Sequence, residues 1–170
     1  FVFITVVLDM LAFGIIIPVF PHLVQVMTGG EISTAVRWTG IMGAMFGLMQ
    51  FVFSPVQGAL SDRFGRRPVV LASTLALGLD FILMAVAATR PSLFIGRIIS
   101  GIASASISTA NAYIADVTPK EKRAAAYGLM GAAFGIGFIF GPALGGFLGG
   151  WSVRAPFWVA AGLALANFVY

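Results

Sequence analysis

Three charged side chains lie inside long apolar stretches of this sequence: Asp9, Asp80 and Arg97. A charge at membrane depth is costly unless it is paired or wetted, so such residues are functional candidates by default. The alternative is a buried pair that only locks helices together. Asp80 and Arg97 lie at similar depth in their stretches, counted at about 1.5 Å per residue, and could neutralise each other. Asp9 has no cation at matching depth, and we predict that it takes up and releases a proton.

A polar stripe follows these charges along the stretch that contains Arg97. Its members are spaced four, three, four and three residues apart, which places them on one helical face: Arg97, Gly101, Ser104, Ser108 and Asn111. Such a face lines a water-filled cavity or packs on another helix through its small residues. We favour the cavity and expect Ser104, Ser108 and Asn111 to contact a substrate. Gln50, in an earlier apolar stretch, is expected to contact the substrate or to bond helix to helix.

Glycines recur every four residues in another apolar stretch, beside one proline. The set is Gly137, Gly141, Pro142 and Gly145, followed by Gly149. A ridge of glycines lets another helix approach closely, and proline, which lacks the amide hydrogen, permits a bend. We expect this ridge to be structural first, and predict that the bend also serves as a hinge.

The polar segment GALSDRFGRRP, residues 58–68, places one acid and three arginines in a short turn. Anchoring at a membrane surface would need only the cations. The acid and two glycines at fixed places indicate a structured latch, in which Asp62 faces a helix N-terminus and Arg66 bonds a nearby carboxylate. Asp116 is the natural partner. The predicted latch comprises Gly58, Asp62, Arg63, Gly65, Arg66, Arg67 and Asp116.

The composition indicates which elements must hold these residues. Of the 170 residues, 59% are hydrophobic and 9% charged, against roughly 25% charged in soluble domains, and the mean hydropathy is +1.01. This pattern is typical of an all-α membrane protein and excludes a soluble domain. Ten scattered basic residues form no continuous phosphate-binding face, so we expect no nucleic-acid partner. The sequence has no metal-ligand set and no pair of nucleophile and base, so we expect no metal, no cofactor and no enzyme.

Five segments are long enough to cross a bilayer, which takes about 20 mostly apolar residues. They are residues 1–27, 38–60, 68–88, 92–115 and 124–149. A sixth, 156–170, stops before it could cross and the first residue is not Met, so we interpret the chain as a fragment. The loops after the second and fourth segments contain six Lys and Arg, against three in the opposite loops. This excess predicts that these two loops and the N-terminus are cytoplasmic.

The chain also resembles itself at an offset of 87 to 88 residues. FVFSPVQG at 51–58 aligns with FIFGPALG at 138–145, and RRPVVLASTLAL at 66–77 aligns with RAPFWVAAGLAL at 154–165. A repeat of three helices must invert its second copy in the membrane, which is a transporter architecture. We therefore predict two inverted repeats, residues 1–88 and 89–170, in which Asp9 and Arg97 occupy equivalent places.

Several of these motifs resemble one family. GALSDRFGRRP is similar to the loop between helices two and three of the major facilitator superfamily, and GRIISGIASAS at 96–106 resembles its helix-four motif with a cavity arginine. GIGFIFGPALGG at 135–146 resembles the helix-five motif of its drug:proton antiporters of twelve helices. The pattern is most similar to that of tetracycline efflux proteins. The resemblance covers the whole chain as the N-terminal six-helix half of such a transporter.

The resemblance implies that Asp9, Asp80 and Arg97 form the proton-coupling set and that Gln50 contacts the cavity. It implies a proton-coupled transporter of the bacterial inner membrane that exports a tetracycline-like or other drug by alternating access. Its partners would be the drug, protons, the lipid bilayer and a C-terminal half against which the latch closes. Two alternatives remain: a proton-coupled metabolite symporter of the same fold, and a non-transporting membrane scaffold fragment.

Overall fold

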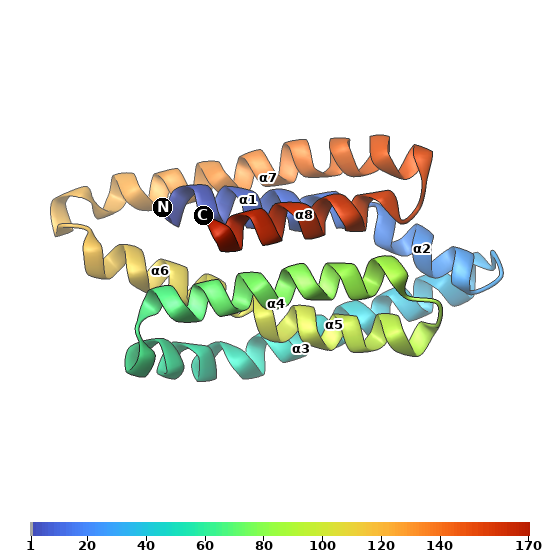
Figure 1. Ribbon diagram of the computed structural model, residues 1–170, viewed down its shortest axis with the longest axis horizontal. Coiled ribbons are helices and arrows are strands. Elements are labelled where there is room, and N and C mark those ends of the chain that lie inside the picture. The colour runs from blue at the N-terminus through green and yellow to red at the C-terminus, as the bar shows by residue number, and fades with distance from the viewer. Residues whose placement is uncertain (1) are drawn as a thin grey trace.

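All of the secondary structure in the computed structural model, which describes residues 2–170, is helical (Figure 1). The first and fourth crossings are each built from two helices, α1 and α2 and then α5 and α6. The helices are α1 (Val2–Ile16), α2 (Val19–Met27), α3 (Ile32–Phe64), α4 (Arg66–Val86), α5 (Arg90–Ser104), α6 (Ser106–Val117), the 3-10 turn η1 (Lys120–Lys122), α7 (Arg123–Trp151) and α8 (Ala155–Val169).

Five crossings in the described residues are long and apolar enough to span a membrane, and α8 is a shorter apolar helix. This matches the five complete segments and the short sixth expected from the sequence. The helices extend beyond the apolar windows, since α3 begins at Ile32 rather than at residue 38. A helix needs no apolar side chains beyond the hydrocarbon layer, so its polar ends continue into the interface.

Two long helices continue through a proline, and the helix breaks lie elsewhere. The long helix α7 runs without interruption through Pro142, as α3 does through Pro55. The breaks lie instead between α1 and α2, at Ile17 and Pro18, and between α5 and α6, at Ala105. A proline inside a helix removes one hydrogen bond, and a long packed helix tolerates that loss.

A seam of glycines joins α1 to α7. A Cβ placed on Gly141 would lie 2.6 Å from the Cα of Gly14, and one on Gly137 would collide with Met10. Because no side chain fits there, the two helix backbones can approach closely, which compensates for the lack of a hydrophobic drive between helices in lipid. The seam fixes α1, and with it Asp9, against α7.

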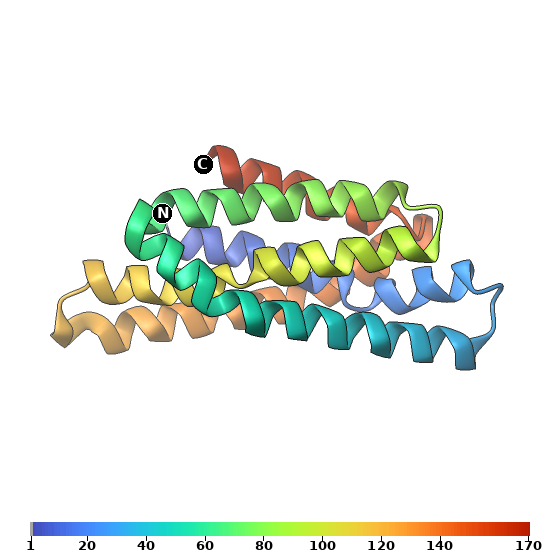
Figure 2. The ribbon, with the colours of Figure 1, turned by 90° about the horizontal axis from the view of Figure 1, so that it is seen from below.

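The remaining packing leaves two helices with much of their surface uncovered. Figure 2 shows α4 and α8 toward one side of the bundle and most of α3 and α7 toward the other. A large apolar core that includes Met84, Leu93 and Phe157 joins α2, α4, α5 and α8. On α3 and α7, Phe51, Ile139 and other large apolar side chains are exposed. These surfaces suit contact with lipid or with further helices.

Both ends of the described chain lie at one end of the bundle, together with the loops after α3 and α6 (Figure 1). The other three loops lie at the opposite end. This arrangement agrees with the topology expected from the charges, in which the N-terminus shares a side with these two cation-rich loops.

Candidate functional site

Asp9 is held by a residue that sequence reasoning missed. Asn167, on α8, donates hydrogen bonds through Nδ2 to Asp9 Oδ1 and to the Thr5 carbonyl, both at 3.0 Å. Its side chain is 1% exposed. A lone amide in the otherwise apolar segment 156–170 is the signal that could have identified it, because a polar group at membrane depth needs a partner.

A central cavity of about 230 Å³ lies beside Asp9. Its polar lining residues are Asp9, Gln50 and Ser104, which come from α1, α3 and α5. The cavity walls are otherwise apolar and rich in aromatic rings: Phe13, Phe46, Phe81, Phe134 and Phe138. A few polar groups in an aromatic wall are typical of sites for amphipathic organic molecules.

Gln50 bonds helix to helix and also faces the central cavity, where contact with a substrate stays a prediction. Its Nε2 donates to the carbonyl of Ser104 at 3.3 Å, so it bonds α3 to α5, and its side chain also lines the central cavity. Ser104 is the last residue of α5, directly before the break at Ala105. The break therefore leaves a carbonyl accessible to Gln50, because the helix ladder is interrupted there.

The remaining polar stripe of the fourth crossing is divided by the same break. Ser108 and Asn111, on α6, line an open groove of about 420 Å³ along α3 rather than the central cavity. The Ser108 hydroxyl donates to the Ala105 carbonyl at 2.8 Å, and the Asn111 carbonyl accepts from Tyr127 at 3.3 Å. Gly101 packs on α3, since a Cβ there would lie 2.5 Å from the Phe46 carbonyl oxygen. The stripe is therefore divided between helix packing at Gly101 and an open groove at Ser108 and Asn111.

Asp80 and Arg97 do not neutralise each other through a direct ion pair, which the sequence had allowed. Asp80, on α4, accepts a hydrogen bond from Ser100, which lies one turn after Arg97 on α5. The Arg97 guanidinium stacks 3.7 Å from the ring centre of Phe20. Asp80 is 1% and Arg97 9% exposed. The aromatic face supplies Arg97 with a cation–π contact in place of a carboxylate. These two described side chains lie outside the lining of the central cavity.

Arg66 is the centre of the predicted latch. It contacts Asp62 at 2.6 Å and, across to the end of α6, Asp116 at 3.0 Å. It also donates to the hydroxyl of Ser61 at 2.6 Å, a residue that the sequence analysis did not include. Gly65 makes the turn between α3 and α4 with φ +95°, a conformation that favours glycine. The turn thus aims Arg66 at three acceptors at once.

The other predicted latch residues lie around this network. The Arg63 guanidinium lies over the ring of its neighbour Phe64 at 5.4 Å. Gly58 accepts from the Ser61 hydroxyl through its carbonyl at 2.7 Å. Arg67 lines a narrow cavity that also contains Asp9. Of the predicted latch residues, Asp62, Arg66 and Asp116 form ion pairs with one another, and the others lie nearby with different contacts.

The predicted hinge residues form part of the α1–α7 seam. Gly137, Gly141 and Gly145 face α1, and their Cβ positions are occupied by atoms of α1 residues 10, 14 and 15. Pro142 lies within the continuous helix α7. The seam gives the three glycines a packing role, and the hinge stays a prediction.

Comparison with known proteins decides the family. Residues 2–170 match the Major Facilitator Superfamily over essentially the whole chain. The chain belongs to this superfamily. The superfamily is one of integral membrane transporters rather than enzymes, in agreement with the resemblance of the sequence motifs.

Relatives of the chain include drug resistance proteins. It is 47% identical over 97% of its length to the class C tetracycline resistance protein of Escherichia coli, of which it covers 41%. It is 35% identical over 91% of its length to multidrug resistance protein 2 of Bacillus subtilis, of which it covers 38%. The chain therefore spans about two fifths of the length of these superfamily relatives.

A solved structure of the superfamily shows the same fold. The human organic anion transporter TETRAN superposes with a TM-score of 0.85 at 26% identity, over 99% of this chain and 44% of that one. The five crossings and the shorter helix α8 thus have the arrangement of the N-terminal half of a major facilitator transporter.

Proposed function

We propose that this chain is the N-terminal half of a proton-coupled exporter of an amphipathic drug such as a tetracycline. The observation that carries the proposal is the position of Asp9, the acid in the wall of the aromatic central cavity. The tetracycline and multidrug resistance proteins among its relatives support a drug as cargo. Protons would enter down their gradient as the drug leaves.

Asp9 would couple drug export to proton entry because its carboxylate could interact with either the drug or a proton. A bound cationic or amphipathic drug favours the charged carboxylate, and protonation removes that attraction. The two ligands would thereby bias the same equilibrium between two conformations in opposite directions. Gln50 and Ser104, in the same wall, would orient the drug through hydrogen bonds.

The size of the central cavity supports a further half of the protein as partner. At about 230 Å³ it is smaller than the roughly 300 to 1,000 Å³ of typical sites for small organic molecules. A C-terminal half packed against the exposed faces of α3 and α7 would complete it. The groove that contains Ser108 and Asn111 opens beside α3 and would become part of the same enlarged site.

The Arg66 network would then serve alternating access. It joins the α3–α4 turn to the end of α6, on the side that the charge distribution assigns to the cytoplasm. The carboxylates of Asp62 and Asp116 are exposed and could contact a C-terminal half. These contacts would form in one conformation and break in the other. The bacterial relatives support an inner-membrane location.

Two inverted repeats, residues 1–88 and 89–170, are supported by features at the same offset as the sequence match. The helix breaks at Ile17 and Ala105 are 88 positions apart, and the close approaches at Gly14 and Gly101 are 87 apart. The first and fourth crossings run in opposite directions along the bundle (Figure 1). The broken helices would place their interrupted backbone beside the site, as in other transporters built from repeats.

The test uses the full-length gene product in inverted membrane vesicles, with internal pH recorded as tetracycline or a lipophilic cation is added. We expect proton release on drug addition and its loss in Asp9→Asn, with Glu31→Gln, in the exposed loop before α3, as the matched control. Proton movement in the opposite direction would favour the metabolite symporter. Folded protein with no proton response to any drug would favour the scaffold. Full activity in Asp9→Asn would show that Asp9 does not couple proton and drug movement.

A further inference from the structure

A second, narrow cavity begins at Asp9 and extends away from the central cavity. It shares Asp9, Met10, Ile107 and Phe134 with the central cavity, but continues along α1 to Thr5 rather than to Phe13. Its volume is about 20 Å³, which is room for about one water molecule. Asp9 thus lies at the junction of two cavities of very different size.

The inner end of the narrow cavity has polar groups suited to a water molecule. Thr5 is 3% exposed, and its Oγ1 has no hydrogen-bond partner among the described residues. Oδ1 of Asn167, whose amide nitrogen bonds Asp9, also has no partner among the described residues, but Asn167 does not line this cavity. Buried water in proteins typically bonds such otherwise unsatisfied groups, with two to four partners each. The Asp9 carboxylate and the Thr5 hydroxyl supply two of them.

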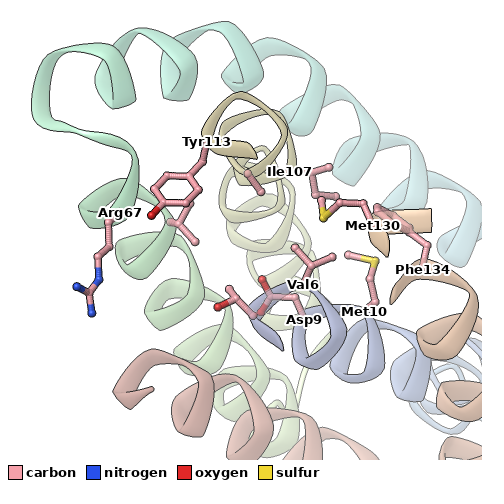
Figure 3. A pocket seen from close by; sticks show the side chains of 11 residues that line it. Val6, Asp9, Met10, Arg67, Ile107, Tyr113, Met130 and Phe134 are labelled. Carbon is pink, nitrogen blue, oxygen red and sulfur yellow. The ribbon is translucent and has the colours of Figure 1, made fainter. Parts of the chain in front are cut away.

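The outer end of this cavity reaches the end of the bundle that holds the Arg66 network. Tyr113, one turn before Asp116 on α6, and Arg67, next to Arg66, are its other polar lining residues. Figure 3 shows the Tyr113 ring and the Asp9 carboxylate on different sides of the space, from different helices. The walls between them are apolar: Val6, Val70, Ile107, Ala110, Met130 and Phe134.

We propose that the narrow cavity binds a water molecule that carries the proton from Asp9 to Tyr113, by a route separate from the central cavity. This rests on the proposed role of Asp9 as the coupling acid. The protonated Asp9 gives its O–H proton to the water, and the water gives one of its own protons to the Tyr113 oxygen. The Tyr113 hydroxyl releases its proton to solvent at the latch end. The water and the Tyr113 oxygen each lose one proton as they gain one, and Asp9 is left as the carboxylate.

The charges around the route are consistent with a relay of this kind. The titratable groups that line it are Asp9 on α1, Arg67 on α4 and Tyr113 on α6, whereas α7 contributes the apolar Met130 and Phe134. The Arg67 guanidinium points away from Asp9 (Figure 3). A fixed positive charge at the mouth disfavours a resting hydronium ion, while neutral groups can still pass protons in turn.

A separate route has a consequence for transport. A drug bound in the central cavity would block access to Asp9 from that cavity, because Asp9 lies in the cavity wall. The proton could still leave through the narrow cavity while the drug is arriving. Drug entry and proton departure can therefore occur in one step without competing for one opening.

The test compares tyrosine variants of the full-length protein in inverted vesicles, together with equilibrium drug binding. Tyr113→Phe removes only the relaying hydroxyl, and we expect drug-driven proton release to slow at least about tenfold with drug affinity unchanged. Tyr127→Phe is the matched control, since the Tyr127 hydroxyl bonds the Asn111 carbonyl outside the narrow cavity. Its proton release should equal that of the wild type.

A second variant tests the space itself. Ala110→Leu fills the narrow cavity from α6 and should also slow proton release at least about tenfold without changing drug affinity. Wild-type rates in Tyr113→Phe, or in Ala110→Leu that folds and binds drug, would overturn the route. If the wild-type protein binds drug but moves no protons, the proposed function fails and not the route alone.

Discussion

Asn167 Nδ2 donates a hydrogen bond of 3.0 Å to Asp9 Oδ1, and thereby joins α8 to the acid of the central cavity. The amide also bonds the Thr5 carbonyl one turn earlier on α1. Because the amide is held at two points, it fixes the direction in which the Asp9 carboxylate faces the cavity.

Replacing Asn167 should therefore impair transport more than folding. A hydrogen bond to a charged group contributes about 1.5 to 3 kcal/mol, so Asn167→Leu should slow drug export about tenfold to a hundredfold. Asn167→Gln keeps the amide and should restore part of the rate. Transport by vesicles and monodispersity in detergent would be measured together. An export rate in Asn167→Leu equal to that of the wild type would show that the bond does not position Asp9.

Arg66→Lys should affect conformational switching rather than stability. Lysine keeps the charge but lacks the planar fork that lets Arg66 bond Asp62, Asp116 and Ser61 together. The side chains of Asp62 and Asp116 are 66% and 56% exposed, and exposed pairs contribute at most about 1 kcal/mol to stability. We expect a several-fold slower export rate with unchanged drug affinity.

Arg63→Lys is the control for that variant, because the Arg63 guanidinium lies over Phe64 rather than on the acids of the network. Export rates and equilibrium binding of both variants would be compared in the same vesicles. Equal export rates in the two variants would rule out a special role for the Arg66 fork.

The α1–α7 seam predicts opposite effects for two neighbouring glycines. Gly141→Ala places a Cβ 2.6 Å from the Cα of Gly14, so the helices must separate, and overpacking of this kind costs about 1 to 3 kcal/mol. At Gly146 nothing lies within 4 Å, so Gly146→Ala should instead stabilise the helix by about 0.5 to 1 kcal/mol. Thermal unfolding in detergent would measure both. A Gly141→Ala variant as stable as Gly146→Ala would contradict the seam.

Glu31 predicts a pH dependence outside the membrane-spanning helices. Hydrogen bonds from Ser33 at 2.6 Å and Thr34 at 2.7 Å lower the pKa of the Glu31 carboxyl in the folded protein. A lowered folded pKa gives stabilisation that is present above the unfolded pKa and is lost as the pH falls through the folded value. Wild type should therefore hold a stability advantage over Glu31→Gln above the ordinary glutamate pKa of about 4.3, and lose it over the acidic range below that value. A constant difference across that range, measured by unfolding in detergent, would contradict the assignment.

The sequence determined the class of the protein and the number of its crossings. Runs of about 20 apolar residues can only be membrane helices in a chain with 9% charged residues, because each unpaired backbone group is costly in lipid. The segment 58–68 and its partner Asp116 could also be predicted, since a short turn leaves its charges few possible positions. The sequence motifs also predicted the superfamily to which the chain belongs.

Only the tertiary structure decided which partners the buried polar groups have. Asp80 and Arg97 lie at similar depth, yet the rotation of α4 and α5 gives one to Ser100 and the other to Phe20. The helix breaks fall at Ile17 and Ala105, whereas α7 continues through Pro142. Asn167 meets Asp9 across 158 residues of sequence. Helical periodicity gives the face of a residue on its own helix, whereas the neighbour opposite that face depends on how the helices pack.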